Sequence, residues 1–585
     1  MTRNQMTGAE IVLRALKDQG VDVVFGYPGG VTLPLYDEIY KQNRLRHVLN
    51  RHEQGSVHAA EGYARSTGKP GVVLVTSGPG ATNTVTGLTD AMMDSIPVVC
   101  LTGQVPTALI GNDAFQEADI TGITRSCTKH NYLVKDVNDL ARILHEAFYV
   151  ATHGRPGPVV VDLPKDVITA SGPYVSPDKV VHRSYKPKVK GDIGKIKEAV
   201  KILSSAKRPM VYAGGGVINS GPGASQLLTQ FVDTAGFPCT LTLMGLGAFP
   251  ASNEKFLGML GMHGTYEANM AMYECDALIS VGARFDDRVT SKVDEFSPNA
   301  KKIHIDIDRS SINKNVLVDV GIVGDAGHVL EDMIKIWKST QARNDKKAMK
   351  AWWKRIDQWR AKKCLAYPKN TRVAKPQYVL ESLAERLAGR DAYVATDVGQ
   401  HQMWAAQYLK FEKPNRLMTS GGLGTMGYGL PAALGVQVAH PDALVVVVTS
   451  ESSIQMNIQE LAVLVQEGLA VKILNLNNGF MGMVRQWQEL FYGERYSQSR
   501  SDGHPDFTKL AEAFGMKGLR AETPDRVEAV LEEMIAHDGP VFADICVDPT
   551  ENVFPMIAAG AAHNEMLLGP NGSNSSESEE DVVLA

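Results

Sequence analysis

The feature that most constrains this chain is a threefold alternation of short apolar runs with stretches of helical periodicity. The apolar runs lie at 21–25, 72–76, 98–102 and 159–162, at 209–213, 277–281 and 302–307, and at 392–396, 444–448, 471–476 and 541–547. Near-continuous runs of this length indicate strands buried on both faces. Because helical patterns separate them, we expect an α/β protein with three doubly wound parallel-sheet domains.

The domain bounds follow from breaks between these blocks. A chain of 585 residues is too long for one hydrophobic core. A stretch rich in Lys and Pro follows the first block, and a polar helical connector at 346–363 follows the second. The last segment ends in a Ser-rich acidic tail that cannot bury enough apolar surface to order itself. We therefore expect domains at 1–180, 191–340 and 375–550, and a C-terminal segment at 551–585 with a disordered tail.

Composition narrows the class of protein. A content of 44% hydrophobic and 21% charged residues is typical of soluble globular proteins, and a net charge of −5 gives no reason to expect nucleic acid. No apolar run reaches the length of a membrane span, and no hydrophobic signal core or targeting leader precedes the capping box of Thr7 and Glu10. The six cysteines form no C-x-x-C pair, which argues against zinc sites and disulfides. We expect a cytoplasmic protein.

Two strands of the third block each deliver an oxygen ligand where they end. The run 444–448 leads to Glu451, and the run 471–476 leads to Asn478. Adjacent parallel strands bring such groups to one sheet edge, where they can hold a hard cation. That cation would anchor a diphosphate.

The same stretch resembles the thiamine-diphosphate motif, which reads Gly-Asp-Gly or Gly-Asp-Ala and then Asn-Asn. Here the triplet reads Ser450, Glu451, Ser452. The continuations at 455–461 and 482–492 are similar to the catalytic subunits of acetohydroxyacid (acetolactate) synthases, and similar motifs run from about 5 to 569. The resemblance implies the thiamine-diphosphate-enzyme architecture with a central FAD-binding domain. It also implies the cofactors thiamine diphosphate, Mg²⁺ and FAD.

The resemblance further implies a transferase that decarboxylates pyruvate and ligates the hydroxyethyl unit to a second pyruvate or to 2-ketobutyrate. This reaction belongs to isoleucine and valine biosynthesis. Members of the family pair the first domain of one subunit with the third domain of another, so a homodimer or tetramer is implied. A small regulatory subunit is the other expected protein partner, with no nucleic acid and no membrane.

In the first block, Glu53 stands at the start of a probable helix, where an acidic residue needs no function because it favours the helix dipole. The resemblance instead gives Glu53 the role of the acid that hydrogen-bonds the aminopyrimidine ring. It assigns catalytic roles to Glu53, Gly30, Gln116 and Lys165, cofactor contacts to Thr76, Pro79 and Asn83, and substrate contacts to Phe115, Met483 and Trp487. Trp487 is implied to favour 2-ketobutyrate, although Trp and Phe at such positions are also common in plain packing.

In the middle block, three strand-like runs end in glycine-rich turns. Such turns suit an extended dinucleotide, yet none has the G-x-G-x-x-G spacing, and a purely structural domain fits the periodicity equally well. The resemblance implies a flavin site in which FAD takes no net part in the reaction. The implied residues are Arg155, Gly214, Gly215, Gly216, Thr242, Leu243, Gly261, Met262, His263, Gly282, Ala283, Arg284, Asp286, Arg288, Val289, Asp306, Ile307 and Asp325.

In the third block, glycines allow a close approach to the diphosphate, and Met426 is implied to wedge beneath a bent cofactor. The resemblance implies cofactor contacts from Val398, Gly399, Gln400, His401, Gly424, Met426, Ser450, Glu451, Ser452, Ser453, Asn478, Gly482 and Met483. The implied metal ligands are Glu451, Asn478 and Phe480.

The altered triplet leaves alternatives open. The extra methylene of Glu451 moves its carboxylate by roughly 1 Å, whereas Mg²⁺ requires near-octahedral ligands at ~2.0 to 2.1 Å. A shifted backbone that keeps activity, weak cofactor binding, and a non-catalytic binding subunit are all compatible with the sequence. Another thiamine enzyme, such as a pyruvate oxidase or 2-hydroxyacyl lyase, is a further alternative. Trp487, Lys165 and Phe115 argue against it.

Overall fold

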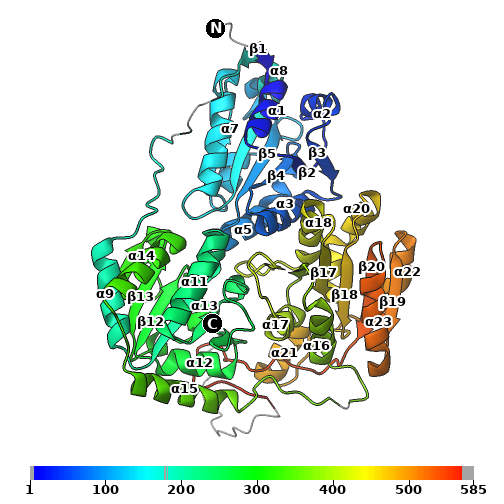
Figure 1. Cartoon of the computed structure of the whole chain (residues 1–585). Coiled ribbons are helices and arrows are strands. Elements are labelled where there is room, and N and C mark those ends of the chain that lie inside the picture. Colours follow the sequence, from blue (N-terminus) through cyan, green and yellow to red (C-terminus); the bar gives the residue numbers. More distant parts are fainter. Residues whose placement is uncertain (1–4, 177–179, 181, 370, 570–585) are drawn as a thin grey trace.

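The computed structural model describes residues 5–176, 180, 182–369 and 371–569 (Figure 1). The tail expected to be disordered, 571–585, lies outside these ranges. Three six-stranded sheets are formed, one from each block of the sequence, and the strands within each sheet are parallel. The expected α/β class with three parallel-sheet domains is therefore confirmed.

The first sheet has the strand order β3-β2-β4-β5-β7-β6. Its strands are β2 (Val23–Tyr27), β3 (Arg46–Leu49), β4 (Gly71–Val75), β5 (Val98–Gln104), β6 (His130–Leu133) and β7 (Val159–Pro164). The helices are α1 (Gly8–Asp18), α2 (Leu33–Tyr40), α3 (Glu53–Thr67), α4 (Pro79–Thr82), α5 (Val85–Asp94), α6 (Ile120–Thr124), α7 (Val137–Thr152) and α8 (Lys165–Thr169). A small antiparallel pair, β1 (Gln5–Thr7) and β8 (Ser171–Pro173), joins the two ends of this domain.

The second sheet has the order β11-β10-β9-β12-β13-β14. Its strands are β9 (Pro209–Ala213), β10 (Cys239–Leu241), β11 (Phe256–Met259), β12 (Ala277–Val281), β13 (Lys301–Asp306) and β14 (Val320–Val323). The helices are α9 (Ile193–Ser205), α10 (Gly215–Asn219), α11 (Pro222–Ala235), α12 (Tyr266–Glu274), α13 (Asp287–Thr290) and α14 (Ala326–Ser339). The predicted connector forms α15 (Lys346–Arg360), and its buried Trp352 and Trp359 pack into the core of this domain.

The third sheet has the order β16-β15-β17-β18-β20-β19. Its strands are β15 (Ala392–Thr396), β16 (Leu417–Met418), β17 (Leu444–Thr449), β18 (Lys472–Asn477), β19 (Lys517–Ala521) and β20 (Val541–Cys546). The helices are α16 (Pro376–Leu387), α17 (Gln400–Tyr408), α18 (Gly429–Ala439), α19 (Glu451–Ile454), α20 (Leu461–Gln466), α21 (Gly482–Phe491), α22 (Phe507–Ala513) and α23 (Pro524–Ala536), with a 3₁₀ segment η5 (Gln455–Glu460) after α19.

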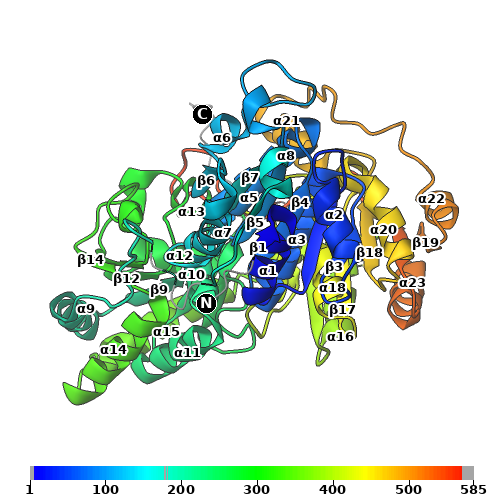
Figure 2. The same ribbon diagram turned by 90° about the horizontal axis from the view of Figure 1, so that it is seen from above.

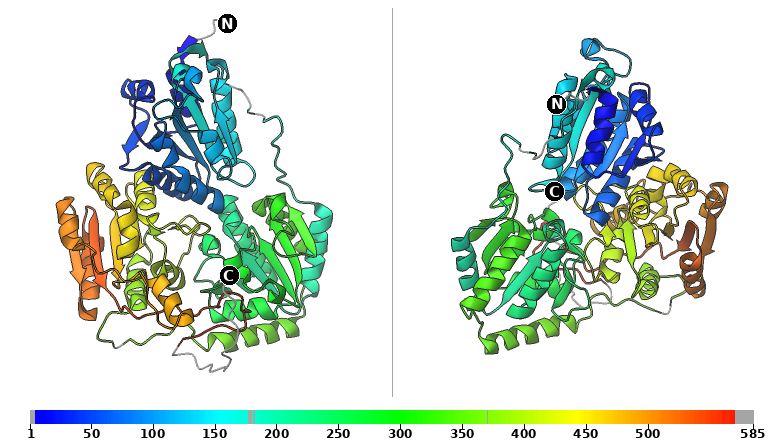
Figure 3. Two further views of the ribbon diagram at one scale, coloured as in Figure 1. Left: turned by 180° about the vertical axis from the view of Figure 1, so that it is seen from behind. Right: turned by 45° about the horizontal axis from the view of Figure 1, so that its top comes forward.

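The first domain lies above the other two, with α3 and α5 turned toward them (Figure 1), and the views from above and behind agree (Figures 2 and 3). Helices α3 and α18 cross in very close contact. A Cβ at Gly62 would lie 2.0 Å from the Ala432 carbonyl oxygen, and one at Gly435 would lie 1.8 Å from the Ala59 carbonyl oxygen. Glycine at the crossing thus lets two domains of one chain pack backbone to backbone.

Candidate functional site

The larger cavity has a volume of about 500 Å³ and is lined by all three domains. This size falls in the range of small-molecule and cofactor sites. Lining residues that the sequence predicted for cofactor or substrate are Arg155, Gly214, Gly215, Gly216, Thr242, Leu243, Met262, His263, Gly282, Ala283, Arg284, Asp286, Arg288, Val289, Asp306, Ile307, Asp325, Val398, Gly399, Gly424, Met483 and Trp487. Gly261 precedes Met262 but does not line the cavity.

Two glycine-rich turns of the middle sheet form the base of this cavity. Gly214 follows β9 and Gly282 follows the neighbouring β12, so the carboxyl ends of adjacent strands meet here. A Cβ at Gly214 would lie 2.5 Å from the Gly282 carbonyl oxygen, which only glycine permits. Such a crevice at the strand ends is where open α/β sheets bind ligands.

Guanidinium groups add positive charge around the cavity. Arg284 pairs with Asp286 at 2.7 Å. Arg155 donates from Nε to Ser95 Oγ at 2.8 Å and lies 3.6 Å from Asp308. Both arginines are partly exposed, so their remaining N–H groups can bind an anionic ligand such as a phosphate.

A smaller cavity of about 60 Å³ lies at the carboxyl ends of β15, β17 and β18. Predicted residues that line it are Val398, Gly399, Gln400, His401, Met426, Ser450, Ser452, Ser453, Asn478, Phe480, Gly482 and Met483. Ser450 and Ser452 take the places of glycine and of a small residue in the family motif, and Ser452 Oγ is hydrogen-bonded to Ser501 Oγ at 2.9 Å. Burial lowers the pKa of His401 to about 3, so its imidazole is neutral.

Glu451 is fully buried behind this cavity and does not line it. Neither of its carboxylate oxygens has a hydrogen-bond partner among the described residues. Burial raises the pKa of Glu451 to about 7, and the backbone N–H groups of Phe480 and Asn478 partly offset that rise. An unpaired buried carboxylate is costly unless a cation or a proton joins it, and the oxygens of Glu451, Asn478 and the Phe480 carbonyl are hard donors. The donor set therefore fits Mg²⁺.

The predicted first-domain residues other than Arg155 line neither cavity. Glu53 is the first residue of α3, and its Oε2 accepts from Asn83 Nδ2 at 2.9 Å. Gly78 (φ 58°) begins the turn before α4, and Gln116 (φ 59°) packs against it. Phe115 is 88% exposed, and Lys165 is exposed at the start of α8. The predicted first-domain residues that line neither cavity are Gly30, Glu53, Thr76, Pro79, Asn83, Phe115, Gln116 and Lys165.

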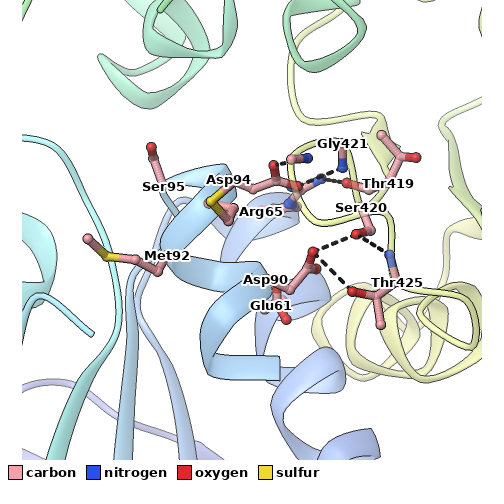
Figure 4. Close-up of polar contacts among 12 residues, drawn as sticks. Glu61, Arg65, Asp90, Met92, Asp94, Ser95, Thr419, Ser420, Gly421 and Thr425 are labelled. Atoms are coloured by element: carbon pink, nitrogen blue, oxygen red, sulfur yellow. Dashed lines mark hydrogen bonds and ion pairs between the residues drawn. The ribbon is translucent and has the colours of Figure 1, made fainter. Parts of the chain in front are cut away.

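Sequence reasoning missed one acidic residue of the larger cavity, Asp94. Asp94 at the end of α5 accepts from Gly421 N at 2.9 Å and from Gly422 N at 2.7 Å, and it pairs with Arg65 at 2.6 Å (Figure 4). Asp94, Gly421 and Gly422 all line the cavity. An acid in the last turn of a helix gives no sign in the sequence that it holds a loop of another domain.

Near Asp94 lies a buried group of His58, Glu61 and Asp90, whose polar side-chain atoms lie within 4.8 Å of one another (Figure 4). Burial raises the pKa values of Glu61 and Asp90 well above their ordinary values and lowers that of His58. Asp90 also accepts from Ser420 Oγ (Figure 4). His58, Glu61 and Asp90 line neither cavity.

Each of the three sheets lies in a region that matches a known protein family. Residues 6–123, 196–333 and 397–545 match the family models for the thiamine pyrophosphate enzyme N-terminal TPP binding domain, central domain and C-terminal TPP binding domain. The chain is 52% identical over 568 residues to the acetolactate synthase isozyme 3 large subunit of Escherichia coli, covering 96% of this chain and 98% of that protein. It is 51% identical to the acetolactate synthase large subunit of Haemophilus influenzae, covering 96% and 98%.

This chain belongs to the acetolactate synthase large subunits. The acetolactate synthase of Mycobacterium bovis is also similar, with 48% identity over 96% of this chain and 91% of that protein. The family expected from 450–461 and 482–492 is thereby confirmed. Among the described residues of this acetolactate synthase subunit, no helix combines the length and apolar composition that crossing a bilayer requires.

Proposed function

We propose that this acetolactate synthase large subunit decarboxylates pyruvate and joins the two-carbon unit to a second pyruvate or to 2-ketobutyrate, in branched-chain amino acid biosynthesis. The observation that carries the proposal is the 52% identity to a named large subunit over 96% of the chain. A small regulatory subunit is its expected partner, and the cytoplasm its expected compartment. The bounds 1–180, 191–340 and 375–550 are proposed for the three domains.

Thiamine diphosphate, when bound, supplies the electron sink for decarboxylation. In the proposal, Gly399, Ser450 and Ser452 hold the diphosphate in the smaller cavity. Glu451, Asn478 and the Phe480 carbonyl hold Mg²⁺, which gives the unpaired carboxylate its missing partner. Met426 lines the same cavity and supports the cofactor from below.

FAD is assigned to the larger cavity. The glycine turns after β9 and β12 allow the backbone to approach a dinucleotide, while Arg155, Arg284 and Arg288 offer positive charge. Met483 and Trp487 line the end of this cavity that reaches the third domain, so they are proposed to contact the second substrate.

Glu53 is proposed to hold the proton that the aminopyrimidine ring exchanges, with Asn83 fixing its orientation. Since Glu53 lines neither cavity of its own chain, we assign it to the smaller cavity of a second copy. Exposed apolar side chains support pairing between the first domain of one copy and the third domain of the other. Leu33 and Phe115 of the first domain are 57% and 88% exposed, and Met456 of the third domain is 55% exposed. Gly30, Gln116 and Lys165 would reach the substrate from the same copy.

Acetolactate formation from pyruvate, with thiamine diphosphate, Mg²⁺ and FAD titrated separately, tests the proposal. We expect product only when all three are present, and a larger yield with a small regulatory subunit. A folded dimer that forms no acetolactate at saturating cofactors would instead support a non-catalytic binding subunit.

A further inference from the structure

A carboxylate of the third domain holds the backbone that immediately precedes Glu53. Glu460, the last residue of η5, is fully buried. Its Oε1 accepts from Arg51 N at 2.9 Å and from His52 N at 3.1 Å, and its Oε2 accepts from Asn50 Nδ2 at 2.9 Å. One side chain thus binds three successive residues in front of the helix that begins with Glu53.

Helix α3 is shaped to receive this carboxylate. Gly55, in its first turn, faces Glu460, and a Cβ there would lie 2.7 Å from Glu460 Oε1. The carboxylate also lies at the N-terminal end of α3, where the helix dipole favours negative charge. The Arg51 guanidinium is not its partner, since it donates to the Leu49 carbonyl at 2.8 Å and to Gln466 Oε1 at 2.6 Å. Glu460 therefore holds the backbone of the two residues that precede α3, Arg51 and His52.

The segment that ends at Glu460 begins at the smaller cavity, which is proposed to hold the diphosphate. Helix α19 begins at Glu451, and η5 follows it directly. Gln455 Nε2 donates to the Glu451 carbonyl at 2.7 Å, and Asn457 Nδ2 donates to the Gly427 carbonyl at 2.8 Å. These bonds hold the path from the Ser450–Glu451 turn to Glu460 at Gln455 and at the kink of Asn457.

We propose that Glu460 is a positioning residue for Glu53 and connects it with the diphosphate cavity of the same chain. This inference rests on the proposed function, in which Glu53 and that cavity serve different active sites of a dimer. Glu460 then couples the two active sites, because a shift of the Ser450–Glu451 turn in one site moves the entry of α3, and with it Glu53, in the other.

Removal of Glu460 acts locally, because other contacts hold the two domains together. Arg46 pairs with Glu467 at 2.7 Å, and the α3–α18 crossing is independent of Glu460. Glu467→Gln is therefore a matched control: it removes an interdomain contact of the same segment without touching 50–52.

Glu460→Gln is the conservative variant. Its amide oxygen can keep the two backbone N–H groups, and its amide N–H can donate to Asn50 Oδ1, which has no partner among the described residues. Glu460→Ala removes all three bonds. Glu460→Asp keeps the charge but withdraws it by one methylene, and it serves if the alanine variant does not fold.

The first measurement is amide hydrogen exchange of the cofactor-free protein. We expect the Arg51 and His52 amides to exchange at least ~10-fold faster in Glu460→Ala, and near the parent rate in Glu460→Gln and Glu467→Gln. The second is exchange of the C2 proton of bound thiamine diphosphate for deuterium. We expect a ~100-fold loss in Glu460→Ala, approaching the loss in Glu53→Gln, and little loss in the other two.

Fast amide exchange with undiminished C2 exchange in Glu460→Ala would overturn the positioning role, and so would equal losses in Glu460→Ala and Glu467→Gln. A parent protein that binds thiamine diphosphate without forming acetolactate would contradict the proposed function but not the inference, because neither measurement requires turnover.

Discussion

At the scale of single residues, the triplet 450–452 departs most from what its family would require. Glu451 stands where the family motif has a shorter acid, and its carboxylate is fully buried without a hydrogen-bond partner among the described residues, whereas Ser450 and Ser452 line the cavity. The longer side chain of Glu451 therefore lies in the protein interior and not in the cavity. Ser450 and Ser452 remain as side chains in the cavity that is proposed for the diphosphate.

Replacing the triplet by Ser450→Gly, Glu451→Asp and Ser452→Ala should tighten thiamine diphosphate and Mg²⁺. Restored contacts are worth on the order of 1 to 3 kcal/mol together, or about 5-fold to 150-fold in affinity. Isothermal titration of the parent and the triple variant measures the change. Equal affinities would mean that the parent already accommodates Glu451 without loss.

Trp487 lines the large cavity beside Met483, where an apolar contact can distinguish ethyl from methyl. Trp487→Leu should lower the preference for 2-ketobutyrate over pyruvate by a factor that corresponds to about 1 to 3 kcal/mol. The ratio of the two products in a competition assay reports this preference. An unchanged ratio removes Trp487 from the acceptor site.

Burial raises the pKa of Glu460 from its ordinary value of 4.5 to about 7, despite hydrogen bonds from Asn50 and the 51 and 52 amides. The folded state therefore binds this proton more tightly than the unfolded state, so its stabilising effect is complete below about pH 4.5 and is lost as the pH rises through about 7. Glu460→Gln carries no such proton. In urea unfolding at a series of pH values, the free energy of unfolding of the variant should rise relative to that of the parent between about pH 4.5 and pH 7. A difference between the two free energies that does not change with pH would disprove the raised pKa.

At the scale of elements, the crossing of α3 and α18 depends on absent side chains. Gly435→Ala places a methyl group against the Ala59 carbonyl and should destabilise the protein by about 1 to 3 kcal/mol. Gly223 in α11 is a matched control, since a Cβ there meets nothing within 4 Å. Gly223→Ala should be neutral or slightly stabilising in the same thermal unfolding experiment. Comparable losses in both variants would show that helix composition, not contact, sets the cost.

The strands and helices of the structure also show which parts of the fold could be predicted from the sequence. Every apolar run predicted as a strand falls in one, because buried parallel strands are nearly continuous in Val, Ile and Leu. The other strands were missed, since they are short and most carry polar residues or glycine: β1, β3, β6, β8, β10, β11, β14, β16 and β19. The flavin-side glycine turns were predictable from their strands. Asp94 and Glu460 were not, because their partners are backbone groups of another domain.

At the scale of the whole molecule, the assignment of Glu53 to a second copy can be tested by mixing defective subunits. Glu53→Gln and Glu451→Ala homodimers should each be inactive. Co-refolded in equal amounts, half of the dimers are hybrids with one intact site of two, so about a quarter of the parent activity should return. A mixture that stays inactive would place both residues in a site formed within one chain.

The separation of Glu53 from both cavities of its own chain has a consequence for dosage. If Glu53 serves the cavity of a second copy, as proposed, a single chain carries both parts of a catalytic site but forms no complete site until it pairs with another chain. When chains are scarce relative to their dissociation constant, the number of working sites grows with the square of the chain concentration, so halving expression leaves only about a quarter of the flux. Flux through such an enzyme falls more steeply than its gene dose.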